Sequence, residues 1–141
     1  MYKNILHASD LSENHFDLCK KSVKFAQSIG ANLHFLHVIE TPASLQWAQS
    51  LGFAELAVPV KDGAQVVMST LGDALNIPSS NLHVEIGSAW SHILDAVKEF
   101  KIDLIVLGSH TDNSMHTFLG STAQAVIHHA TCDVLTMKND N

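Results

Sequence analysis

The stretch from Gly108 to Thr122, GSHTDNSMHTFLGST, has the residue types of a loop that binds an anion. It follows an apolar run and ends on Gly120 and Ser121, where a helical pattern begins. A helix that starts there presents unpaired backbone N–H groups and the positive end of its dipole, which can bind phosphate without a lysine. The loop therefore predicts a phosphate contact by Gly120, Ser121 and Thr122. The alternative is that Ser121 only caps the helix.

Alternating strand and helix patterns would position this loop. Apolar and β-favouring runs predict five strands, at residues 4–8, 32–39, 82–86, 103–108 and 133–137. Apolar residues at helical spacing predict helices over 12–29, 60–75, 90–100 and 121–130, with a loop and one short helix between 40 and 59. Strands that alternate with helices form right-handed βαβ units, so we expect an α/β fold with a parallel sheet and helices on both faces.

Open sheets of this kind bind ligands beyond the carboxyl ends of strands, where the strand order reverses. The two most polar strand exits are SDLSE after the first strand and GSHTDN after the fourth. If these two strands are neighbours, both exits border one crevice. That adjacency is a hypothesis at this point.

Composition restricts the class of protein. The chain has 141 residues, 46% apolar and 16% charged, which predicts a single domain over 1–141 with a packed core. Its net charge of −6 argues against nucleic acid or acidic lipid as a partner. Two cysteines make no disulfide framework, and neither a signal peptide nor a membrane span is expected, so we predict a cytoplasmic protein.

Four blocks, NILHASDLSE, LHFLHVI, DLIVLGSH and LGSTAQAVIHHATCDVL, together resemble the universal stress protein family. The resemblance covers essentially the whole chain, and the last block is its most specific part. It implies a doubly wound, Rossmann-like sheet with strand order 3-2-1-4-5, usually in a homodimer. Many members bind ATP or AMP, whereas members similar to the founding bacterial type do not.

The nucleotide-binding members carry G-x-x-G, a spacer and then G-[ST] in the loop after the fourth strand. Here Gly108 matches the first position, and Gly120 and Ser121 match the last pair. Thr111 stands in place of the second glycine, and Ser114 replaces a further glycine. Because threonine avoids positive φ, Thr111 either moves the loop or costs about 1–3 kcal/mol of strain. Its hydroxyl could instead donate to phosphate.

The resemblance also implies contacts outside this motif. Ala8, Ser9 and Asp10 form the exit of the first strand, and Asp10 matches an acidic residue near the adenosine of binding members. Val38 matches the position whose backbone contacts adenine. His110 is expected to line the pocket. Because the chain is acidic, a triphosphate would need Mg²⁺ with it.

We therefore predict a stress-response regulatory protein that binds ATP or AMP at the exits of strands one and four. The alternative is a homodimeric scaffold that binds unknown protein clients and no nucleotide, which Thr111 and Ser114 favour. Slow ATP hydrolysis is a third alternative, for which no catalytic residue is named. Ten histidines form no HxxxH or HExxH motif, so no metal site is predicted. The apolar edge strand Asp133–Met137 is the predicted dimer contact.

Overall fold

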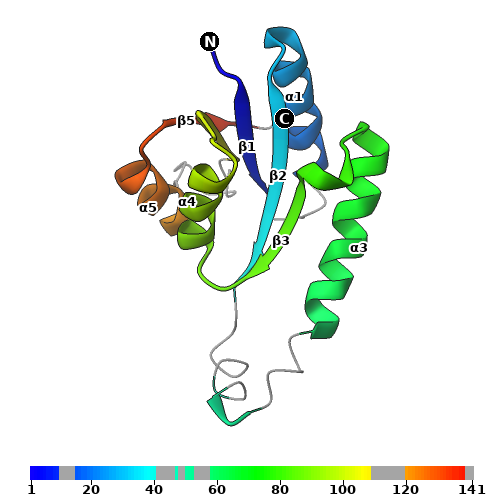
Figure 1. The fold of residues 1–141 in the computed structure, drawn as a ribbon, viewed down its shortest axis with the longest axis vertical. Coiled ribbons are helices and arrows are strands. Elements are labelled where there is room, and N and C mark those ends of the chain that lie inside the picture. Colours follow the sequence, from blue (N-terminus) through cyan, green and yellow to red (C-terminus); the bar gives the residue numbers. More distant parts are fainter. Residues whose placement is uncertain (10–14, 41–46, 48–49, 53–57, 109–119, 139–141) are drawn as a thin grey trace.

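The computed structural model describes residues 1–9, 15–40, 47, 50–52, 58–108 and 120–138 (Figure 1). Its centre is one sheet of five parallel strands in the order β3-β2-β1-β4-β5. The strands are β1 Asn4–Ser9, β2 Asn32–Ile39, β3 Leu82–Ile86, β4 Leu104–Gly108 and β5 Asp133–Met137. The predicted doubly wound α/β fold and its strand order are confirmed.

Helices cover both faces of the sheet (Figure 1). One face packs against α1 (His15–Ile29) and α3 (Val58–Leu75), and the other against α4 (Ala89–Glu99) and α5 (Ser121–His129). A single turn of 3₁₀ helix, η2 (Ser79–Asn81), precedes β3. Among the described residues, no helix is both long and apolar enough to cross a membrane.

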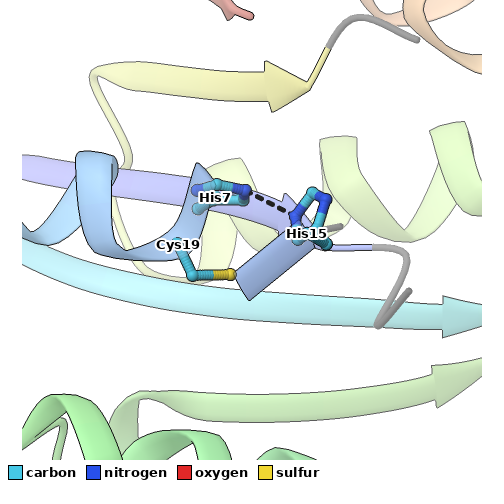
Figure 2. A group of neighbouring side chains, drawn as sticks. All are labelled: His7, His15 and Cys19. Carbon is cyan, nitrogen blue, oxygen red and sulfur yellow. Dashed lines mark hydrogen bonds between the residues drawn. The ribbon is translucent and has the colours of Figure 1, made fainter. Parts of the chain in front are cut away.

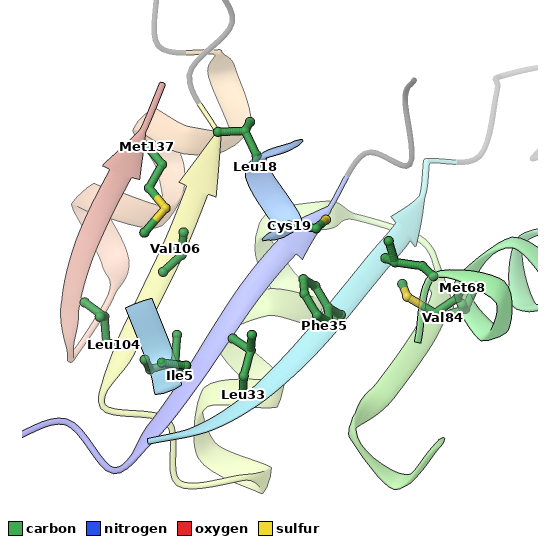
Figure 3. Close-up of a cluster of buried hydrophobic side chains, with 12 residues drawn as sticks. Ile5, Leu18, Cys19, Leu33, Phe35, Met68, Val84, Leu104, Val106 and Met137 are labelled. Atoms are coloured by element: carbon green, nitrogen blue, oxygen red, sulfur yellow. The ribbon is translucent and has the colours of Figure 1, made fainter. Parts of the chain in front are cut away.

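The apolar core has two layers because successive side chains of a strand point to opposite faces. On β1, Ile5 joins the layer beneath α1 and α3, and Leu6 joins the layer beneath α4 and α5. Figure 3 shows the first layer, in which Phe35 of β2 is fully buried. Since both faces are covered, the strands read as nearly continuous apolar runs.

The predicted elements agree with the structure to within about two residues where they lie in described segments. The clearest difference is the start of α3, which begins at Val58, so that Pro59 lies inside its first turn instead of the preceding loop. The apolar spacing of these helices includes two adjacent pairs, Val67 with Met68 on α3 and Val126 with Ile127 on α5. In each pair one residue is buried, Met68 and Val126, and the other is exposed, Val67 at 50% and Ile127 at 45%.

A partly buried polar network joins the amino ends of β2 and β3. Asn32 Nδ2 donates to His34 Nε2 at 3.2 Å, and Asn32 is oriented by a bond from Asn81 Nδ2 to its Oδ1 at 2.8 Å. His34 Nε2 must therefore accept, which leaves His34 Nδ1–H to donate to His83 Nε2 at 3.0 Å. Both rings stack on Phe100, with centroid distances of 4.9 and 4.3 Å. This arrangement accommodates only neutral imidazoles.

Acidification is expected to destabilise the protein through this network. Burial lowers the pKa of His34 below its usual 6.5, as does the nearby His83. Burial also lowers the pKa of His83, although Glu99 and Glu85 oppose the shift. The unfolded chain then binds more protons, so the stabilisation is complete above about pH 6.5 and is lost as the pH falls toward the folded-state pKa values.

The measurement is the melting temperature between about pH 7.5 and pH 5.5. We expect a fall of several degrees in the wild type and a smaller fall in His34→Gln, which has no titrating group at that position. An equal fall in both proteins would assign the pH dependence to other histidines.

Candidate functional site

The site lies at the carboxyl edge of the sheet, where the chain reverses direction. From β1 the chain continues to β2 and β3 on one side, and β4 and β5 lie on the other. Ala8 of β1 pairs with Leu107 of β4, and Ser9 pairs with His37 of β2. The hypothesis that strands one and four are neighbours is therefore confirmed, and the edge is the kind of switch point at which open α/β sheets bind ligands.

Four of the predicted site residues meet at this edge. Ala8 and Ser9 end β1, Gly108 ends β4, and Val38 follows the residue of β2 that pairs with Ser9. Ala8 and Val38 are partly buried and pack with the layer beneath α4 and α5. Their side chains give this part of the edge an apolar surface.

His37 also belongs to this edge, although no motif in the sequence singles it out. Its Nδ1–H donates to the carbonyl oxygen of Ser9 at 2.8 Å. This bond joins the last residue of β1 to the side chain of β2 and fixes the tautomer of His37. Only the register of the two strands could have identified it.

The amino end of α5 faces the same edge because α5 leads from the loop after β4 back to the start of β5. Gly120 is the N-cap residue, and as a glycine it makes no side-chain cap bond. Ser121 is the first helical residue, so the alternative that Ser121 caps the helix is wrong. Ser121 is exposed and Thr122 is half-buried. Because Gly120 has no side chain, it does not cap the first backbone N–H groups of α5. These groups can donate hydrogen bonds to an anion.

The two motif glycines differ in what surrounds them. A Cβ atom at Gly120 would meet nothing within 4 Å, and its φ of −60° suits any residue. A Cβ at Gly108 would lie 2.8 Å from Leu18 Cδ1 and 3.4 Å from His15 Cε1. Gly108 therefore lets the start of α1 pack against the exit of β4, whereas Gly120 leaves space beside the helix terminus.

The remaining predicted site residues, Asp10, His110 and Thr111, lie outside the described residues. Their predicted contacts, including the effect of threonine at the second motif position, stay predictions.

A five-stranded doubly wound parallel sheet with helices on both faces places the chain in the class of Rossmann-like α/β proteins. A sequence profile described as the Universal stress protein family matches residues 1–138. The chain belongs to the universal stress protein family.

Individual relatives agree with this assignment. Universal stress protein A homolog 2 of Coxiella burnetii is 34% identical over 142 residues, which cover 97% of this chain and 95% of that protein. The solved structure of universal stress protein UspA from Lactobacillus plantarum is 30% identical, with a TM-score of 0.64 over 96% of this chain and 97% of that one. A family role in the stress response is thereby supported.

One solved structure bears on ligands. The crystal structure of a universal stress protein in complex with cAMP has a TM-score of 0.66 to this chain, covers 97% of each chain and is 16% identical. At that identity the likeness concerns the fold alone. That protein shows that this fold can hold an adenine nucleotide.

Proposed function

We propose that this protein binds an adenine nucleotide, AMP or ATP, at the carboxyl edge of β1, β2 and β4. The observation that carries the proposal is the open amino end of α5, with Gly120 as an N-cap that has no side chain, at the switch point. The relative with bound cAMP supports the proposal at the level of the fold.

Each part of the edge suits a part of such a ligand. The first amides of α5 and the hydroxyls of Ser121 and Thr122 would donate to a phosphate. Ala8 and Val38 offer partly buried apolar surface that suits the adenine ring. Asp10, which matches the acidic position of binding relatives, would contact the ribose. ATP would enter with Mg²⁺, because a chain of net charge −6 repels a free triphosphate.

Gly120→Asp is expected to lower the nucleotide affinity strongly without unfolding the protein. The site tolerates a side chain, since Gly120 has open space around its Cβ position and an ordinary backbone conformation. Aspartate is a good N-cap residue, so it would occupy the first amides of α5 and also repel phosphate. We expect at least a tenfold loss of nucleotide affinity, about 1.4 kcal/mol, with equal or higher thermal stability.

Gly120→Asn is the matched control, because asparagine caps about as well as aspartate but carries no charge. Affinities for AMP, Mg·ATP and cAMP would be measured by isothermal titration calorimetry. The rise in melting temperature would be measured as well, since a ligand at a hundredfold its dissociation constant adds about 2.7 kcal/mol to the free energy of unfolding. The expected order of affinity is wild type, then Asn, then Asp. Wild-type protein that binds none of the three nucleotides would refute the proposal.

The second candidate is an interaction scaffold that acts as a homodimer on protein clients. Thr111 and Ser114 favour it, because both replace glycines of the nucleotide-binding motif. A wild-type melting temperature that no adenine nucleotide raises would support this candidate. In either case we place the protein in the cytoplasm, where the free thiols of Cys19 and Cys132 would stay reduced.

A further inference from the structure

Three side chains with metal-ligating atoms meet between β1 and the start of α1. They are His7 of β1 and His15 and Cys19 of α1, and Figure 2 shows them side by side. One ligand atom from each residue lies within 4.8 Å of the other two. The Nε2 atoms of the two histidines are 2.8 Å apart. All three side chains are buried, with exposed fractions of 0% for His7, 5% for His15 and 1% for Cys19.

The fold brings them together by simple periodicities. His7 follows Ile5 by two residues on β1, so both side chains point to the face that α1 covers. His15 and Cys19 are four residues apart on α1 and therefore share one side of the helix. A search for histidine pairs at helical spacing overlooks this H-x-x-x-C pair, and no local pattern reveals that His7 lies opposite it.

The contacts of His7 are compatible with the form of the ring that a metal requires. Ser22 Oγ contacts His7 Nδ1 and lies 3.7 Å from Met137 Sδ. With the one hydroxyl hydrogen of Ser22 directed at Met137 Sδ, His7 Nδ1–H donates to Ser22 Oγ and the His7 Nε2 lone pair faces His15, which is the tautomer that the site requires. Histidines that bind metals almost always donate their other ring N–H in this way, which orients the ring.

We propose that His7 Nε2, His15 Nε2 and Cys19 Sγ bind one thiophilic transition-metal ion, with Zn²⁺ as the reference ion. Two imidazole nitrogens and a thiolate are ligands that zinc prefers, and three protein ligands leave one position open. Nitrogens on tetrahedral zinc lie about 3.3 Å apart and a nitrogen and a sulfur about 3.5 Å apart, so the two rings at 2.8 Å must separate slightly and the widest separation in the cluster, up to 4.8 Å, must close by about 1 Å.

The metal replaces a proton between the two rings. In the metal-free protein His15 Nε2–H donates to His7 Nε2. On binding, the His15 proton moves to Nδ1, the Cys19 thiol loses its proton to solvent, and each of the three atoms donates a lone pair. Each metal ion that binds releases one proton, from the Cys19 thiol. The affinity for the metal should therefore rise with pH.

This site uses other ligand groups than the proposed nucleotide site, although the two are neighbours. Its ligands lie on the face beneath α1, whereas Ala8 and Val38 belong to the face beneath α4 and α5, and His15 packs against Gly108 at the exit of β4. The cobalt band reports on the metal site alone, so failure of nucleotide binding does not decide the metal proposal.

Cobalt titration of Cys132→Ser tests the proposal without disturbing the cluster. The chain has two cysteines, so in this variant any thiolate–cobalt charge-transfer band must come from Cys19. We expect that band, with the d–d absorption of a four-coordinate ion, at one Co²⁺ per chain, and its loss when Zn²⁺ displaces Co²⁺. Exposed histidines such as His128 and His129 can bind cobalt but give no thiolate band.

Two further variants locate the ligands. Cys19→Ser in the wild-type background should lose the band and bind Zn²⁺ at least tenfold more weakly, and Ser22→Ala should weaken binding about 10- to 100-fold by freeing the ring of His7. Circular dichroism in the presence of EDTA checks that each variant folds. Absence of a thiolate band in reduced Cys132→Ser, or a Zn²⁺ affinity that Cys19→Ser leaves unchanged, would overturn the proposal.

Discussion

Replacement of Phe35 by alanine is expected to lower the free energy of unfolding by about 3–5 kcal/mol, the usual cost of removing a buried aromatic ring. Phe35 is fully buried near the middle of β2, and its ring centroid lies 5.3 Å from that of His7. The cavity would open in the layer shared by β1, β2 and α1, where the chain has little room to collapse. Because domains of this size are stable by about 5–15 kcal/mol, the loss is a large part of the total.

Urea denaturation followed by circular dichroism measures this change. Phe16→Ala is the matched control, since Phe16 lies on α1 with 40% of its surface exposed and should change the stability by about 0.5 kcal/mol or less. Similar losses for the two substitutions would mean that the layer beneath α1 is not the cooperative core.

The segment around Phe35 shows why the fold could be predicted from the sequence. The segment from Asn32 to Ile39 is apolar and rich in β-favouring residues because β2 is covered on both faces, and this composition is typical of strands in a covered parallel sheet. Helix α4 is also predictable from the sequence, since Ile93 and Val97 are four residues apart and lie on its buried face. Local pattern and global fold agree in these segments.

Single positions on helices were less predictable. Ile127 is apolar and follows the helical spacing of α5, yet it is exposed, because Ala123 and Val126 already fill the contact with the sheet. Periodicity gives the direction of an apolar face to within about one residue, and the packed neighbours decide which residue is buried.

The candidate site was predictable in outline for topological reasons. The ends of the strands and the start of the helix at Gly120 follow from the local sequence. The adjacency of β1 and β4 follows from the doubly wound strand order. Contacts between residues distant in the chain were not predictable. The bond from His37 to the Ser9 carbonyl, the pair of His34 with His83 and the cluster around His7 each depend on register or on helix placement.

The edge position of β5 makes proline substitution a sharp test of the proposed homodimer. Among the described strands β5 pairs with β4 alone, and its other edge would pair with the β5 of a second copy. Adjacent residues of a strand direct their N–H groups to opposite edges, so of Val134 and Leu135 one faces β4 and the other faces outward. Proline removes that N–H in each case.

The two proline substitutions should therefore change different properties: one lowers the stability of the protomer, and the other disrupts the dimer. Proline at the residue that faces β4 should destabilise the protomer by about 1–3 kcal/mol, through the loss of a ladder bond and the carbonyl left unpaired. Proline at the other residue should leave the melting temperature of the protomer nearly unchanged and yield monomers in size-exclusion chromatography with light scattering. Wild-type protein that runs as a monomer, or two variants that both remain dimeric, would exclude the β5 edge as the dimer contact.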